Sequence, residues 1–148
     1  MNRDRLEALV AWYQTLTPSS LSRLSEFYTD DAWFKDPFQE FASRARLRRV
    51  YEHMFETLEQ PRFEVTGTVL EGRQGFLIWN MHFRRGGRAF TLHGSTHLLF
   101  TEDGRVCRHR DYWDAAEELY EKLPVLGWLM KRLKKKIQAP VGPGHLEG

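Results

Sequence analysis

The segment FLIWNMHFRRGGRAFTLHGSTHLLF, residues 76–100, carries the clearest fold signal in the chain. Apolar and polar residues alternate on both sides of Arg85-Gly86-Gly87, and a period of two residues is typical of β-strands. Short glycine-rich connections join antiparallel strands as hairpins. The segment therefore predicts two long antiparallel strands over residues 76–84 and 88–100.

The same two-residue period extends to both sides of this hairpin. It predicts strands over residues 62–70 and 105–113, joined through turns at 71–75 and 101–104, which gives an antiparallel meander. The first third of the chain has helical spacing instead, over residues 6–16 (with Asn2 as its N-cap), 21–28 and 47–58. A turn at 29–31 and a short strand at 32–36, stopped by Pro37, lie between the second and third helices. Helices first and strands later predict an α+β fold.

The length of 148 residues suits one domain, placed at residues 1–138. Residues 115–138 return to helical spacing, interrupted at Pro124, and five of the six residues from 131 to 136 are basic. This predicts a basic amphipathic C-terminal helix, which could lie on an anionic bilayer as a peripheral contact or cover a pocket with its lysines in solvent. Residues 139–148, with two Pro and three Gly, are predicted to be a flexible tail.

Composition excludes several functional classes. Cys107 is the only cysteine, and no spacing of His, Cys and carboxylates suits a metal, so we expect no metal site and no cofactor. The charged first residues and the lack of a long apolar run predict a cytoplasmic protein. A formal charge of +2 gives no reason to expect a nucleic-acid partner. The aromatic content of 14% is high and is typical of a filled core or a pocket for a hydrophobic ligand.

Strand alternation also predicts which residues face the helices. In the first strand of the hairpin these are Leu77 and its alternate successors, and in the second they run from Phe90 to Phe100 in steps of two. In the last strand the same face carries His109 and Asp111, two polar groups within reach of each other that point toward a mostly apolar interior. The outer face then carries the polar set His82, His93 and His97, and the last two are too far apart, at roughly 13 Å, to share a metal ion.

Two motifs resemble a known family. Residues 28–38, YTDDAWFKDPF, resemble the YADDA-x-x-x-DPF segment of bacterial ketosteroid isomerases. Residues 100–106, FTEDGRV, followed by Tyr112-Trp113, resemble the F-x-x-x-GR(I/V)…YW end of the same enzymes. Related patterns occur in SnoaL-like polyketide cyclases and the wider nuclear-transport-factor-2-like superfamily. The resemblance covers residues 6–118 and implies a cone-shaped α+β fold in which N-terminal helices pack on a curved antiparallel sheet.

The resemblance also implies site residues. Asp36 matches the general base, Tyr13 the oxyanion-hole tyrosine, and Tyr28 and Tyr51 the tyrosines that support it. Thr96 stands where the isomerases have a second, protonated aspartate. His109 and Asp111 stand where they are apolar, and would form an auxiliary acid–base pair. The remaining ligand-binding positions are Phe34, Phe55, Trp79, Met81, Phe83 and Trp113.

Each of these groups also has a structural interpretation: Asp36 could close the turn before Pro37, the tyrosines could be core residues, and His109 with Asp111 could be a buried pair. Two functions follow. One is a cofactor-independent enzyme for proton transfer, isomerisation, hydration or cyclisation of a small hydrophobic carbonyl compound. The other is a non-catalytic lipid- or isoprenoid-binding module that docks on a membrane or a partner enzyme. Proteins of this scaffold commonly dimerise through the outer sheet face, and the resemblance therefore implies a homodimer.

Overall fold

The computed structural model describes residues 3–118 and Lys135. The chain divides into two compact units, Met1–Trp113 and Asp114–Gly148, each described by itself. The predicted basic helix and tail therefore lie outside the described residues, except for α4 (Ala115–Glu118) and Lys135. Asp114 starts α4 as its cap, because its carboxylate accepts hydrogen bonds from the backbone of Ala116 and Glu117. No helix in the described part of the chain is long and apolar enough to cross a membrane.

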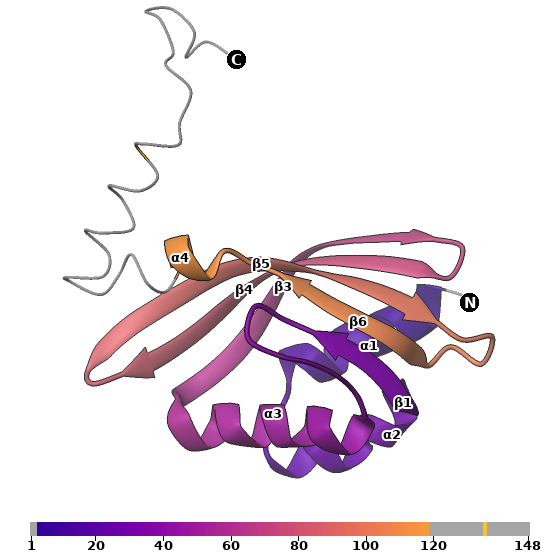
Figure 1. The fold of residues 1–148 in the computed structure, drawn as a ribbon, viewed down its shortest axis with the longest axis horizontal. Helices are drawn as coiled ribbons and strands as arrows, with labels where there is room; N and C mark the ends of the chain where they lie inside the picture. The colour runs from indigo at the N-terminus through magenta and orange to yellow at the C-terminus, as the bar shows by residue number, and fades with distance from the viewer. Residues whose placement is uncertain (1–2, 119–134, 136–148) are drawn as a thin grey trace, which may run out of the picture. The chain divides into compact units, whose positions relative to one another are not determined.

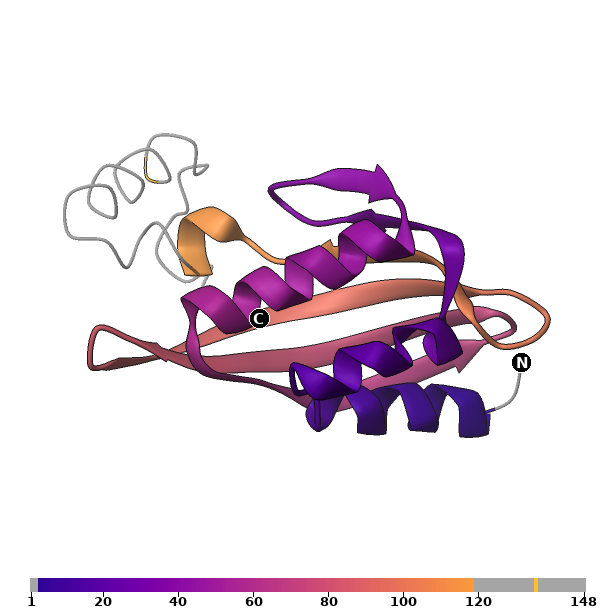
Figure 2. The same cartoon turned by 90° about the horizontal axis from the view of Figure 1, so that it is seen from below.

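The first unit has its four helical elements on one face of a curved, open six-stranded sheet (Figures 1 and 2). The helical elements are α1 (Arg3–Gln14), a 3-10 turn η1 (Ser19–Arg23), α2 (Leu24–Phe27) and α3 (Arg44–Thr57). The strands are β1 (Tyr28–Lys35), β2 (Glu40–Ala42), β3 (Glu59–Glu71), β4 (Gln74–Arg85), β5 (Arg88–Phe100) and β6 (Val106–Tyr112). Their order across the sheet is β2-β1-β6-β5-β4-β3, and this arrangement confirms the predicted α+β class.

The predicted meander is confirmed, because β3, β4, β5 and β6 pair in sequence as antiparallel neighbours. The predicted faces of β4 and β5 are also confirmed, whereas on β6 a register shift beside Phe100 makes Val106 the buried residue in place of Cys107, which alternation with His109 puts on the inner face. Leu77, Trp79 and their alternate successors on β4 are buried, whereas Ile78 on the opposite face is 57% exposed. The buried face meets the apolar side of the helices, and this layer forms the core.

The prediction for residues 28–36 was wrong in its boundaries. The turn expected at 29–31 is part of β1, which begins at Tyr28 and pairs in parallel with β6. Residues 29–31 have a turn-like local sequence, and the register of the β1–β6 pairing shifts between Tyr28 and Trp33. Pairing with β6 nevertheless keeps this segment in the sheet. β2, which has three residues, was not predicted, because it is too short to show alternation.

Candidate functional site

A buried polar cluster lies under the helices at the centre of the sheet. It joins Tyr13 from α1, Tyr28 from β1, Tyr51 from α3 and His109 from β6. The Tyr28 hydroxyl lies 2.8 Å from His109 Nδ1, and the Tyr13 hydroxyl lies 3.2 Å from the same nitrogen. The Tyr13 hydroxyl also contacts the hydroxyls of Tyr28 and, at 3.2 Å, of Tyr51. The structure thus brings together four residues that are far apart in the sequence.

The cluster continues along the sheet through Asp111. Its Oδ1 lies 2.7 Å from His109 Nε2 and accepts a second hydrogen bond, of 2.6 Å, from the Thr96 hydroxyl. Thr96 in turn accepts a 2.8 Å hydrogen bond from the indole nitrogen of Trp79. Thr96 and Asp111 meet because they are register partners on β5 and β6. An unbroken hydrogen-bonded chain therefore runs from Trp79 to the three tyrosines.

The carboxylate sets the direction of one hydrogen bond in this network. A carboxylate oxygen accepts, so the 2.7 Å contact of His109 Nε2 with Asp111 is an N–H donated by the imidazole ring. Burial raises the pKa of the Tyr13 and Tyr28 hydroxyls well above the usual value of about 10. The neighbouring tyrosines add to the shift at Tyr13, whereas at Tyr28 Tyr51 adds to it and the hydrogen bond with Tyr13 opposes it. Burial also raises the pKa of Tyr51, helped by the charge of Asp111. All three tyrosines therefore remain protonated donors at neutral pH.

A small cavity opens beside this chain. Six of its lining residues belong to the hydrogen-bonded chain: Tyr13, Tyr51, Trp79, Thr96, His109 and Asp111. The other three are apolar: Phe63, Val65 and Leu77. The cavity has a volume of about 20 Å³, which gives room for one or two water molecules. Within residues 3–118, the hydrogen bonds to Asp111 all go to Oδ1 and leave Oδ2 unengaged. The side chain of Asp111 is 19% exposed, and Asp111 lines the cavity.

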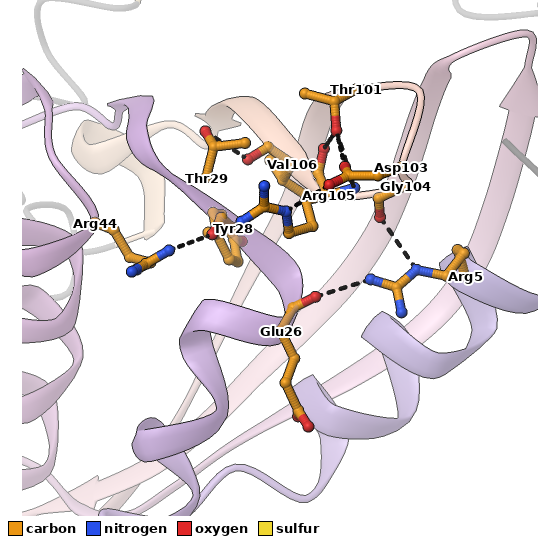
Figure 3. Close-up of polar contacts among 10 residues, drawn as sticks. All are labelled: Arg5, Glu26, Tyr28, Thr29, Arg44, Thr101, Asp103, Gly104, Arg105 and Val106. Carbon is orange, nitrogen blue, oxygen red and sulfur yellow. Dashed lines mark hydrogen bonds and ion pairs between the residues drawn. The ribbon is translucent and has the colours of Figure 1, made fainter.

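Hydrogen bonds from side chains to backbone carbonyl groups hold the segment around Tyr28 in place (Figure 3). Arg44 at the start of α3 donates a 2.9 Å hydrogen bond to the Tyr28 carbonyl oxygen, and Arg5 on α1 donates a 2.8 Å bond to the carbonyl of Glu26. Arg5 also reaches Gly104 in the β5–β6 turn, and Thr29 donates to the Val106 carbonyl. These bonds tie α1, α3 and β6 to the segment that carries Tyr28.

Asp36 lies outside this cavity lining. Its Oδ1 accepts hydrogen bonds from the backbone of Phe38 and Gln39, at 2.8 and 2.9 Å, and its Oδ2 accepts from the Gln39 side chain. The carboxylate thus caps the turn between β1 and β2, which is the structural role considered from the sequence. A turn-capping aspartate and a catalytic one leave the same local sequence, Asp-Pro-Phe.

The aromatic positions implied by the resemblance separate in the structure. Trp79 lines the cavity, whereas Phe34 packs against the His109 ring at 4.9 Å and Trp113 packs against Phe38 at 5.4 Å. Three more positions lie in or against the hydrophobic core without lining the cavity: Phe55, Met81 and Phe83. Phe63 and Val65 were missed as lining residues, although alternation along the strand from residue 62 places them on the inner face.

Comparison with known proteins is consistent with this geometry. The family model of the SnoaL-like domain matches residues 9–109. The chain belongs to the SnoaL-like domain family. No curated protein matches the chain in sequence.

Solved structures share the fold of this SnoaL-like domain. A hypothetical protein with a ketosteroid isomerase-like fold from Catenulispora acidiphila, in complex with trimethylamine, is 15% identical with a TM-score of 0.66, over 80% of this chain and 92% of that one. An NTF2-like protein of unknown function from Burkholderia pseudomallei is 15% identical with a TM-score of 0.68, over 79% and 95%. TsrD from Streptomyces laurentii is 20% identical with a TM-score of 0.65, over 84% and 93%. These likenesses show the fold alone.

Proposed function

We propose that this SnoaL-like domain is a cofactor-independent acid–base enzyme that moves a proton next to the carbonyl of a small hydrophobic compound. The observation that carries the proposal is a cavity lined together by Tyr13, Tyr51 and Asp111, whose Oδ2 accepts no hydrogen bond within residues 3–118. A base and an oxyanion donor on one small cavity are the two groups that enolisation needs.

Asp111 is the proposed base. Oδ2 takes a proton from the carbon next to the carbonyl, the electron pair of that C–H bond forms a C=C bond to the carbonyl carbon, and the C=O π pair moves to the oxygen to give an enolate. The protonated Asp111 then returns the proton to the same carbon or to a conjugated one, so atoms and charge balance. Thr96 and His109 hold Oδ1 at 2.6 and 2.7 Å, and they aim the carboxylate without occupying its reactive oxygen.

Tyr51 is the proposed donor to the developing oxyanion. The Tyr13 hydroxyl contacts Tyr28, Tyr51 and His109, whereas the Tyr51 hydroxyl interacts with the other two tyrosines, and its contact with Tyr13 is long, at 3.2 Å. Tyr51 can exchange this long bond for one to a ligand oxygen. Its raised pKa keeps the proton on the hydroxyl while the enolate forms. Tyr13 and Tyr28 then support Tyr51 through the cluster.

The walls define the ligand. Phe63, Val65, Leu77 and Trp79 offer apolar and aromatic contacts. A neutral compound with one carbonyl group matches these walls better than a charged one, because Asp111 would repel an anion. Since the cavity has room for only one or two water molecules, the side chains must move apart to admit a ring-sized ligand.

Deuterium exchange tests the proposal without knowledge of the natural substrate. The protein is incubated in D₂O with 2-cyclohexen-1-one and a panel of related cyclic ketones, and deuterium incorporation is followed by NMR. We expect exchange above the buffer rate, a loss of about a hundredfold or more in Asp111→Asn, and a smaller loss in Tyr51→Phe. Asp36→Asn is the matched control and should retain the activity. Equal exchange in wild type and Asp111→Asn, or loss in Asp36→Asn alone, would overturn the assignment of the base.

A further inference from the structure

Trp79 on β4 lies against a bare stretch of backbone on β5. Its register partner is Gly94, and a Cβ atom built on Gly94 would lie 2.4 Å from Cη2 and 2.5 Å from Cζ2 of the indole. Real Cβ atoms essentially never approach another atom this closely. The six-membered ring of Trp79 therefore occupies the space that any side chain at residue 94 would need.

Two further contacts fix the same ring. Phe63 packs edge-on to Trp79, with centroids 5.7 Å apart and an interplanar angle of 89°. The indole nitrogen donates its 2.8 Å hydrogen bond to Thr96, which in turn donates to Asp111. A side chain at residue 94 would push the Trp79 ring away from the β5 backbone and toward the interior. There the ring would enter the cavity that Phe63, Val65 and Leu77 also line. It would also move the indole N–H away from Thr96.

We propose that Gly94 is a specificity-determining residue: it seats the Trp79 indole against the sheet, and this sets both the width of the cavity and the position of the donor to Thr96. The seating itself is independent of any reaction, whereas its consequence for substrate size rests on the proposed function. Glycine is required here by close approach of a neighbouring ring and not by a left-handed backbone, because Gly94 has no positive φ.

The substitution Gly94→Ala tests the seating directly. The indole N–H signal of Trp79 is assigned by its absence from the NMR spectrum of Trp79→Phe. In Gly94→Ala we expect this signal to shift and its exchange with solvent to become at least about tenfold faster. Gly67→Ala is the matched control, since a Cβ on Gly67 of β3 would make only an ordinary 3.6 Å contact with Ile78. A Trp79 signal as unperturbed in Gly94→Ala as in Gly67→Ala would overturn the proposal.

A double-mutant cycle covers the case in which Gly94→Ala folds poorly. Trp79→Phe removes the far ring of the indole, so adding Gly94→Ala to it should no longer cause a clash. We expect Gly94→Ala to lower the urea midpoint of unfolding in the wild-type background and to leave it nearly unchanged in the Trp79→Phe background. An equal fall of the midpoint in both backgrounds, or failure of the double variant to fold where Trp79→Phe folds, would overturn the proposal.

Substrate size supplies a separate readout. If deuterium exchange occurs, Trp79→Phe should shift the preference from 2-cyclohexen-1-one toward a bicyclic ketone such as 1-tetralone, and Gly94→Ala should restrict it. An unchanged preference in both variants would overturn the specificity part. If no ketone exchanges in wild type, the proposed function fails, and the NMR signal and the unfolding cycle still decide the seating of Trp79.

Discussion

Thr96→Val should destabilise the protein although it keeps the shape of the side chain. The Thr96 hydroxyl is buried, with the residue 3% exposed, and it makes two hydrogen bonds at once. It accepts from the Trp79 indole at 2.8 Å and donates to Asp111 Oδ1 at 2.6 Å. Valine replaces the hydroxyl by a methyl group, so the indole N–H and one site on the carboxylate lose their partner together.

The magnitude follows from these two losses. A buried donor left without a partner costs about 1–3 kcal/mol, and a hydrogen bond to a charged group contributes about 1.5–3 kcal/mol. Both groups border a cavity with room for one or two water molecules, so water can replace part of what is lost. We therefore expect the free energy of unfolding to fall by about 2 kcal/mol, with the upper bound near the sum of the two terms.

Urea unfolding followed by far-ultraviolet circular dichroism measures this change. Thr96→Ser is the matched control, because it keeps the hydroxyl and removes only a methyl group, with an expected cost of about 1 kcal/mol. The denaturant slope should be unchanged in both variants. If Thr96→Val were no less stable than Thr96→Ser, the hydroxyl could not be the bridge between Trp79 and Asp111, and the argument for a fixed carboxylate would fail.

Two further predictions concern pH and assembly. The raised pKa values of the three buried tyrosines favour the neutral form in the folded state, so their contribution to stability is fully present below the unfolded value of about 10 and is lost as pH rises above it. An absorbance titration should show them ionising only as the protein unfolds; free titration of all five tyrosines of the chain in the folded state would contradict this. On the outer sheet face, the exposed apolar side chains Val69, Phe76, Ile78, Leu99 and Tyr112 favour a two-fold homodimer. Ile78→Lys should give a monomer by sedimentation at micromolar concentration while the control Glu56→Lys stays dimeric, and a monomeric wild type would refute the assignment.

Much of the fold was predictable because the strands have one buried and one exposed face. Alternation gave the correct inner residues of β4 and β5, and His109 and Asp111 on β6, but it missed the register shift that buries Val106 in place of Cys107. The parallel pairing of β1 with β6 was not predictable, since it joins residues about 75 positions apart, as in Trp33 with Arg108, and leaves no local pattern. The strand β2 gave no signal because three residues are too few to show alternation.

The sequence pointed to some of the residues that meet in the buried cluster and not to their connections. Tyr13, Tyr28 and Tyr51 were identified through the resemblance, and His109 with Asp111 through alternation. Their joining into one hydrogen-bonded chain depends on the helix positions and on the Thr96–Asp111 register, which the sequence does not specify residue by residue. The register also relates Thr96 to Asp111. By the resemblance, Thr96 on β5 stands where the isomerases have a second aspartate, and Asp111 offers a carboxyl group at the partner position on β6. The difference between a turn-capping and a cavity-facing Asp36 likewise depends on tertiary placement.

Mapping the binding position of a small ketone tests the central claim most directly, namely that the reacting groups line the cavity between β3–β6 and the helices. Increasing amounts of 2-cyclohexen-1-one are added to isotope-labelled protein, and NMR follows the Trp79 indole N–H, the His109 ring and the backbone of residues 36–39. We expect saturable changes at Trp79 and His109, weakened in Tyr51→Phe, and none at the turn. Saturable changes confined to the Asp36 turn would contradict the account.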